Sequence, residues 1–163
     1  MAKSPYDIKT DATFSEAAHT AIRKQLEELL DNLPGTRAGD DIEALHDMRV
    51  ASRRLRAALS VFADVFPAKQ FDPLEKQVAK VTDALGAVRD ADVLIEFMQS
   101  VRDQSPESGR VGLDVFLDHL QKGRHAERVH LVKALDQLEK GRFRRDFEAM
   151  LNPTETDGGR HHG

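Results

Sequence analysis

The 163-residue chain contains no cysteine, no tryptophan and a single tyrosine. The absence of cysteine excludes a disulfide scaffold, a thiolate metal site and a cysteine nucleophile. No stretch approaches the roughly 18 consecutive apolar residues that predict a transmembrane helix, so we expect no membrane partner. The first twenty residues also lack the apolar run of a secretory signal. These absences together predict a cytoplasmic protein.

Charge is unevenly distributed along the chain, although the net charge is only −4. Residues 1–48 hold ten acidic and five basic residues, whereas residues 49–60 hold four arginines and no acid. Residues 121–145 hold eight basic residues against three acidic ones. Arginine outnumbers lysine 15 to 9, and its guanidinium group is the better bidentate partner for phosphate and carboxylate oxygens. The sequence therefore predicts local basic surfaces on a mildly acidic protein.

Apolar residues recur at helical spacing through most of the chain. Thr13–Glu16 has the pattern of a capping box that starts a helix, and Asp72 followed by Pro73 has the pattern of another helix start. Together with the Pro and Gly breaks, these signals predict four long helices and one short helix. Their expected ranges are about 13–33, 40–66, 72–103, 111–140 and, for the short one, 142–151.

The predicted fold is all-α, because no alternating apolar pattern of strand length appears anywhere. Four long amphipathic helices joined by short loops favour an antiparallel four-helix bundle with a short fifth helix. Residues 1–12 lack periodicity and are expected to form a flexible N-terminal arm. The bundle is expected over residues 13–151, and the polar residues 152–163 are expected to form a disordered tail.

The strongest candidate site is a basic strip on the second predicted helix. At about 100° per residue, His46, Arg49, Arg53 and Arg56 occupy a strip roughly 80° wide and about 15 Å long. The strip lies beside the apolar seam, so a neighbouring helix would turn it into the wall of a groove. Arg54 points away from it. Arg49 and Arg53 repel each other at i,i+4 spacing, and a bound polyanion would remove that repulsion. The alternative is that acids of neighbouring helices pair with these arginines.

Basic residues also interrupt the apolar stripes of the later helices. Arg89 and Asp92 lie on or beside one stripe. Either they form a structural ion pair, or Asp92 orients Arg89 into the groove. Arg124 falls where a leucine is expected, and Arg128 lies on the edge of the same stripe. These two arginines either mark where the bundle opens toward a ligand or are paired with acids such as Glu127.

Signals for catalysis and metal binding are weak. Asp90 and Asp92 form a D-x-D pattern, but on a helix they point about 200° apart and cannot share one ion. The sequence has no P-loop, no G-x-G-x-x-G, no H-E-x-x-H and no G-x-S-x-G motif. We therefore expect no catalytic residue, no metal site and no cofactor.

Two linked motifs resemble those of the CHAD family, the conserved histidine α-helical domain. The motifs are His46-x-x-Arg49-Val50-x-x-Arg53-Arg54-Leu55-Arg56 and Leu85-Gly86-x-x-Arg89-Asp90-x-Asp92-Val93. The resemblance covers roughly residues 14–150 and implies an all-helical, non-catalytic module that binds inorganic polyphosphate through a basic surface. By this resemblance the polyphosphate-binding residues are His46, Arg49, Arg53, Arg56 and Arg89, with Arg124 and Arg128 as a later, looser R-x-x-x-R.

The chain departs from the family in its size. Family members usually carry two related helical bundles, whereas this sequence accounts for one bundle and the start of a second. Either it is a short form or the sequence is truncated. A single bundle would offer a shallow groove, and two copies could rebuild the full surface as a homodimer with two-fold symmetry.

The sequence as a whole predicts non-catalytic binding of inorganic polyphosphate. Basic groups spread along about 15 Å of helix suit an extended chain of regularly spaced charge better than a compact nucleotide. The phenylalanines lie on apolar stripes and leave no stacking platform, so we expect no specific nucleic acid partner. One alternative is a helical scaffold module that docks acidic protein partners. The other is an enzyme acting on phosphate esters or anhydrides, which no metal-binding carboxylate cluster supports.

Overall fold

The computed structural model describes residues 13–152, and within that range it is all-α with no β-strand. The predicted arm over residues 1–12 lies outside the described residues, as does the predicted tail beyond Asn152. The α-helices in chain order are α1 (Phe14–Asp31), α2 (Leu33–Ala38), α3 (Ile42–Val61), α4 (Ala68–Asp103), α5 (Glu107–Lys140) and α6 (Phe143–Leu151). The predicted fold class is confirmed, with α1, α3, α4 and α5 as the four long helices and α6 as the short one.

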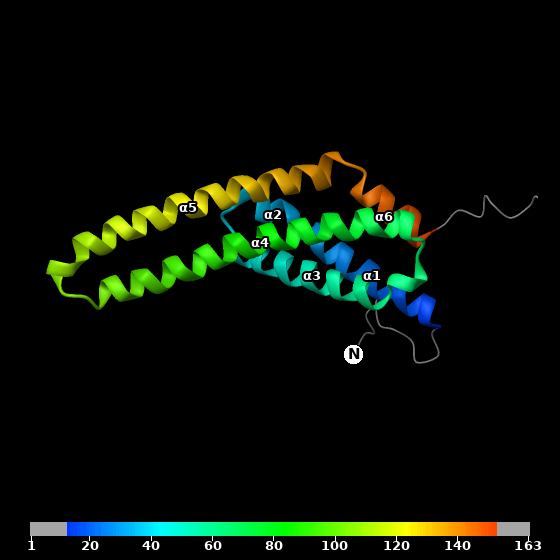
Figure 1. Ribbon diagram of the computed structural model, residues 1–163, viewed down its shortest axis with the longest axis horizontal. Coiled ribbons are helices and arrows are strands. Elements are labelled where there is room, and N and C mark those ends of the chain that lie inside the picture. The colour runs from blue at the N-terminus through cyan, green and yellow to red at the C-terminus, as the bar shows by residue number, and fades with distance from the viewer. Residues whose placement is uncertain (1–12, 153–163) are drawn as a thin grey trace, which may run out of the picture.

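The longest helices, α4 and α5, form an antiparallel hairpin that runs the length of the molecule (Figure 1). The other helices gather along the half of this hairpin that holds the start of α4 and the end of α5 (Figure 1). There α3 packs against α4, α1 packs against α3, and the short α2 contacts both α3 and α5. Consecutive long helices are therefore antiparallel neighbours, as short connections require.

The hydrophobic core occupies only one half of the hairpin. Its α4 members end at Val88 and its α5 members begin at Leu131. We call residues 89–130 the distal hairpin. Within it only Ile95 and Leu117 are buried hydrophobic side chains. Seven large apolar side chains of the distal hairpin are exposed, namely Val93, Leu94, Phe97, Val111, Val115, Phe116 and Val129.

Side-chain caps fix the starts of two helices at, or one residue from, the predicted places. The Thr13 hydroxyl accepts a hydrogen bond from the backbone N–H of Glu16 at 3.2 Å, which caps α1. The Asp41 carboxylate accepts hydrogen bonds from the N–H groups of Glu43 and Ala44 and caps α3, the helix that carries the basic strip. Gly141 ends α5, as its position after the last apolar residue predicts.

The short helix α2 lies outside the predicted ranges, because Pro34 and Gly35 follow the first predicted helix and are typical of a helix end. Pro34 instead lies in the first turn of α2, where the missing N–H would have no helical partner. The Thr36 hydroxyl donates to the Asn32 carbonyl at 2.7 Å and is buried. Gly39 then ends α2 with a left-handed φ of 82°.

The predicted start of the third long helix at Asp72 is wrong, because α4 begins at Ala68 and includes Pro73. The extra turn is stabilised by Phe71, which is buried in the core, so burial outweighs the local start signal. The other long helices differ by similar amounts. α3 ends at Val61 and a 3-10 turn follows, and α5 begins at Glu107.

None of the helices in the described range combines the length and the apolar character that a membrane crossing needs.

Candidate functional site

The basic strip of α3 lies beside the part of that helix that faces the core. His46, Arg53 and Arg56 are exposed, and Arg49 is half-buried. On the adjoining face Leu55 is fully buried. Burial of this seam fixes the rotation of α3 about its own axis, and the rotation carries the cationic side chains to one edge of the helix. The strip is therefore held by packing and not by ion pairs within α3.

The opposing wall of the strip is α4. Arg56 approaches Asp83 of α4 with 3.7 Å between Nη1 and Oδ1, and the two side chains are 49 % and 77 % exposed. Such an exposed pair contributes little stability, but it shows which turns of the two antiparallel helices lie level with each other. One turn further along, Arg53 lies level with Gly86. Two turns further along, Arg49 lies level with residues 89–90.

Four basic side chains on these two helices have their hydrogen-bonding atoms free within the described part of the chain. Among the residues that the structure describes, the side chains of His46, Arg49, Arg53 and Arg89 make no ion pair and no hydrogen bond. Arg89 is half-buried on α4, three residues after Gly86. By this register, Arg89 lies on the turn of α4 that is level with Arg49 of the strip. We call these four groups, together with Arg56, the basic edge.

Asp92 has a different partner from the one considered in the sequence. The Nε–H of Arg124 donates to the Asp92 carboxylate, so the pair joins α5 to α4. The two side chains are only 29 % and 22 % exposed. Asp92 therefore does not pair with Arg89, and Glu127 is not the acid that Arg124 binds. Arg89 is left available at the basic edge.

Arg128 is engaged with the backbone of α2. Its Nη2 donates to the carbonyl oxygens of Thr36 at 3.2 Å and Arg37 at 2.6 Å. These carbonyls belong to the last turn of α2, where a helix has no internal donors for them. A cationic donor at this end also interacts favourably with the helix dipole. Arg128 thus caps α2 and ties it to α5.

The structure brings together five of the seven predicted site residues and separates the other two. His46, Arg49, Arg53, Arg56 and Arg89 share the basic edge of α3 and α4. Arg124 and Arg128 project from α5 and are held by Asp92 and by the end of α2. A direct role of these two arginines in ligand binding stays a prediction.

Arg37 is an organising residue that the sequence did not single out. Its Nη1 binds Asp136 at 2.6 Å and its Nη2 binds Glu139 at 2.9 Å, which fastens α2 to α5. The hydrogen bond that Arg37 donates to Asp136 raises the pKa of Arg37, although burial acts in the opposite direction. The signal in the sequence was two acids at i,i+3 spacing within an otherwise basic stretch.

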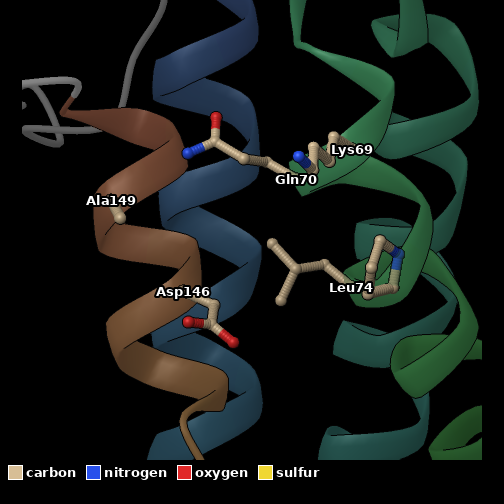
Figure 2. A pocket seen from close by; sticks show the side chains of 6 residues that line it. Lys69, Gln70, Leu74, Asp146 and Ala149 are labelled. Atoms are coloured by element: carbon tan, nitrogen blue, oxygen red, sulfur yellow. The ribbon is translucent and has the colours of Figure 1, made fainter.

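A cavity of about 230 Å³ lies elsewhere, between the start of α4 and α6 (Figure 2). Lys69 and Gln70 reach it from α4, and Asp146 and Ala149 face it from α6 (Figure 2). It contains no member of the basic edge. In residues 13–152 we find no group of three or more His, Asp or Glu side chains that could hold a metal ion.

The fold and the basic edge define a class of protein, an all-α module with cationic side chains along the junction of two antiparallel helices. The chain belongs to the CHAD domain family, whose model matches residues 20–162. The family assignment made from the two motifs is therefore confirmed.

Two relatives come from Mycobacterium tuberculosis. The "Uncharacterized protein Rv2226" of strain ATCC 25618 / H37Rv is 30 % identical over 115 residues. The "Uncharacterized protein MT2285" of strain CDC 1551 / Oshkosh has the same identity over the same length. The match covers 71 % of this chain but only 20 % of each relative, so the chain spans about one fifth of their length.

Proposed function

We propose that this chain binds inorganic polyphosphate without catalysis, through the basic edge of α3 and α4. The observation that carries the proposal is that His46, Arg49, Arg53 and Arg89 have no acidic partner in the described structure. The unpaired guanidinium groups along this edge repel one another, and a polyanion would relieve that repulsion. Membership of the CHAD family supports the same ligand.

The shape of the basic edge suits an extended ligand. His46 and Arg56 are ten residues apart on α3, which corresponds to about 15 Å along the helix. Arg89 adds a cation from the second wall, so a linear chain of phosphates could be held from both sides. Guanidinium groups bind phosphate oxygens in a bidentate manner, and four of the five groups of the basic edge are arginines.

The alternative of an acidic protein partner is less well supported. Stable protein interfaces combine charge with a well-packed apolar centre. Among the exposed large apolar side chains of the described residues, those on α3 are Ile42 and Val61, and both lie beyond the ends of the basic strip. A competition experiment discriminates between the two, because only a polyphosphate module would release a bound acidic protein when polyphosphate is added.

The decisive experiment is a titration with long-chain polyphosphate at two salt concentrations. We expect the wild-type chain to bind, and Arg49→Ala/Arg53→Ala to lose most of its affinity while its helicity is unchanged. The matched control is Arg144→Ala/Arg145→Ala, which removes the same charge from the exposed face of α6. Equal binding by the two double variants would contradict the proposal. Release of orthophosphate on long incubation would contradict its non-catalytic part.

The proposal includes a homodimer that works in the cytoplasm. Near the core, α3 covers the hairpin and α1 covers α3, but the distal hairpin has no such covering helices. Its exposed side chains include Phe97 on α4 and Val115 on α5, which are 61 % and 69 % exposed. A second distal hairpin, related by two-fold symmetry, would supply two helices and complete a four-helix arrangement. The dimer would carry two basic edges and hold a long polyphosphate more tightly than one copy.

A further inference from the structure

Gly86 lies at the middle of the 36-residue helix α4, where glycine is unfavourable. Apart from proline, no residue is a poorer choice for a helix interior. Two reasons usually justify such a glycine, a left-handed backbone or a close contact with another part of the protein. The first does not apply, because Gly39 is the one residue of the described range that has a left-handed φ.

The second reason does not apply to Gly86 either. Beyond the adjacent residues and the backbone of its own helical turns, a Cβ atom placed on Gly86 would meet no atom within 4 Å, so the fold leaves that space open. Gly35 shows the contrast, because a Cβ there would come within 2.8 Å of the Cβ of Ala44. The packing of the protein therefore explains Gly35 but gives no reason for glycine at position 86.

The empty space lies within the basic edge. Gly86 follows Asp83 by three residues and precedes Arg89 by three, so the three positions follow one another along one side of α4. The contact between Arg56 and Asp83 places Arg53 of α3 level with Gly86. Bare backbone of α4 at Gly86 therefore lies level with Arg53 of α3 and about one turn from Arg89 of α4, and neither arginine has a side-chain partner in the described structure.

We infer that Gly86 is the point at which bound polyphosphate passes against the backbone of α4. This inference rests on the proposed function. Without a side chain at position 86, a phosphoryl group can lie deep enough for Arg53 and Arg89 to bind its oxygens from opposite sides. A side chain at this position would hold the chain away from one or both guanidinium groups.

The same geometry makes Gly86 a specificity-determining residue. An unsubstituted phosphate chain is narrow along its whole length, whereas a nucleic acid carries a sugar and a base on each phosphate. Only the narrow chain can use the space over Gly86 while it keeps both arginine contacts. Gly86 therefore favours polyphosphate over single-stranded nucleic acid at equal charge.

The test uses Gly86→Ala and Gly86→Leu in the full chain. We expect polyphosphate affinity to fall about threefold for alanine and about tenfold or more for leucine. The thermal midpoint should stay the same or rise, because both residues favour the helix over glycine. The weak affinity for single-stranded DNA of matched charge should change less than the affinity for polyphosphate. The difference between the two affinities should therefore be smaller in the variants than in the wild type.

Gly112→Ala and Gly112→Leu are the matched controls. Gly112 also lies in a long helix with nothing within 4 Å of its Cβ position, but it lies on the distal hairpin. Because the distal hairpin is also the proposed dimer interface, all variants are compared at a protein concentration at which light scattering shows monomers, and both Gly112 variants should then bind polyphosphate like the wild type. Wild-type affinity in Gly86→Leu, or an equal loss in Gly112→Leu, would overturn the inference. If circular dichroism shows that Gly86→Leu is misfolded, Gly86→Ala decides instead, and wild-type polyphosphate affinity in that variant would overturn the inference.

The results separate the two proposals. If the wild-type chain does not bind polyphosphate, or binds it independently of Arg49 and Arg53, the proposed function fails. If wild-type binding depends on these arginines but Gly86→Ala and Gly86→Leu bind normally, only the inference about Gly86 fails.

Discussion

The guanidinium group of Arg128 lies in the space that a side chain on Gly39 would need. A Cβ on Gly39 would come within 2.6 Å of Cζ of Arg128, while the same arginine donates to the carbonyls that end α2. Gly39 also has a left-handed φ of 82°. The backbone conformation and the packing thus independently require glycine, at the turn that leads into the helix carrying the basic strip.

The first prediction concerns this turn. Gly39→Ala should destabilise the protein by about 2 kcal/mol, because alanine in the left-handed region is strained and would displace Arg128. Chemical denaturation followed by circular dichroism measures the change. Gly112→Ala serves as control and should be neutral or stabilising, since nothing lies near its Cβ position. A Gly39→Ala variant as stable as the wild type would show that Arg128 does not need this space.

The second prediction concerns the ion pair between Arg124 and Asp92. Asp92→Asn alone should cost about 1–3 kcal/mol, because it leaves a largely buried guanidinium group with a weaker partner. The double variant Asp92→Leu/Arg124→Leu should recover most of that loss, since no charge is then left unpaired. Denaturation measures both values. The double variant also tests Arg124 as a ligand-binding residue, because its polyphosphate affinity should fall less than that of Arg49→Ala/Arg53→Ala.

The third prediction concerns pH and the turn of the hairpin. Arg102 near the end of α4 binds Asp114 of α5, and this hydrogen bond lowers the pKa of Asp114 below its usual 3.8. A carboxyl group whose pKa is lowered by folding stabilises the native state above its unfolded-state pKa. That contribution disappears as the pH falls through the lower folded-state pKa. The thermal midpoint of the wild type should therefore exceed that of Asp114→Asn at pH 7, and the difference should close below about pH 4. A constant difference down to pH 2 would contradict this explanation.

The fourth prediction concerns salt. The logarithm of the polyphosphate affinity should fall linearly with the logarithm of the salt concentration, because binding releases salt cations that were associated with the polyphosphate. Each arginine of the basic edge that contacts phosphate should account for about one unit of slope. Arg53→Ala should therefore give a shallower line than the wild type, whereas Arg54→Ala, which removes a charge from another face of α3, should leave the slope nearly unchanged. Parallel lines for all three proteins would place the ligand elsewhere.

The fifth prediction concerns the distal hairpin. Light scattering should show a dimer of the wild-type chain, and Phe97→Glu or Val115→Glu should convert it to a monomer with unchanged helicity, because a charge in an apolar interface is costly. Val61→Glu is the control, since Val61 is equally exposed but lies at the end of α3. A wild-type monomer at high protein concentration would remove the homodimer from the proposal.

The apolar periodicity was sufficient to predict every α-helix of the described range except α2, and to predict the side of α3 on which the strip lies. Met48, Leu55 and Leu59 repeat at helical spacing and are all fully buried, so the rotation of α3 followed from the sequence. The start of α4 was less predictable, because Asp72 and Pro73 form a strong local start signal that burial of Phe71 overrides. Local signals decide a boundary only where tertiary packing adds nothing.

The partners of the arginines could not be predicted, because helical phase gives the direction of a side chain but not the register of the next helix. Asp92 is three residues from Arg89 in sequence, yet it binds Arg124, which is 32 residues away. Arg128 binds backbone carbonyls of a helix that the sequence did not predict. Both contacts depend on how α4, α5 and α2 are placed relative to one another. The helical phase read from a single sequence does not give that placement.

The turn at the end of the hairpin offers a practical route to the geometry of the assembly. Gln104 lies there, about 22 Å along α4 from Arg89, so a change at this tip leaves the cationic groups undisturbed. Since the native polypeptide has no thiol, Gln104→Cys would accept one spin label or fluorophore per subunit. Distances between such labels would report directly how two subunits are oriented in the proposed homodimer.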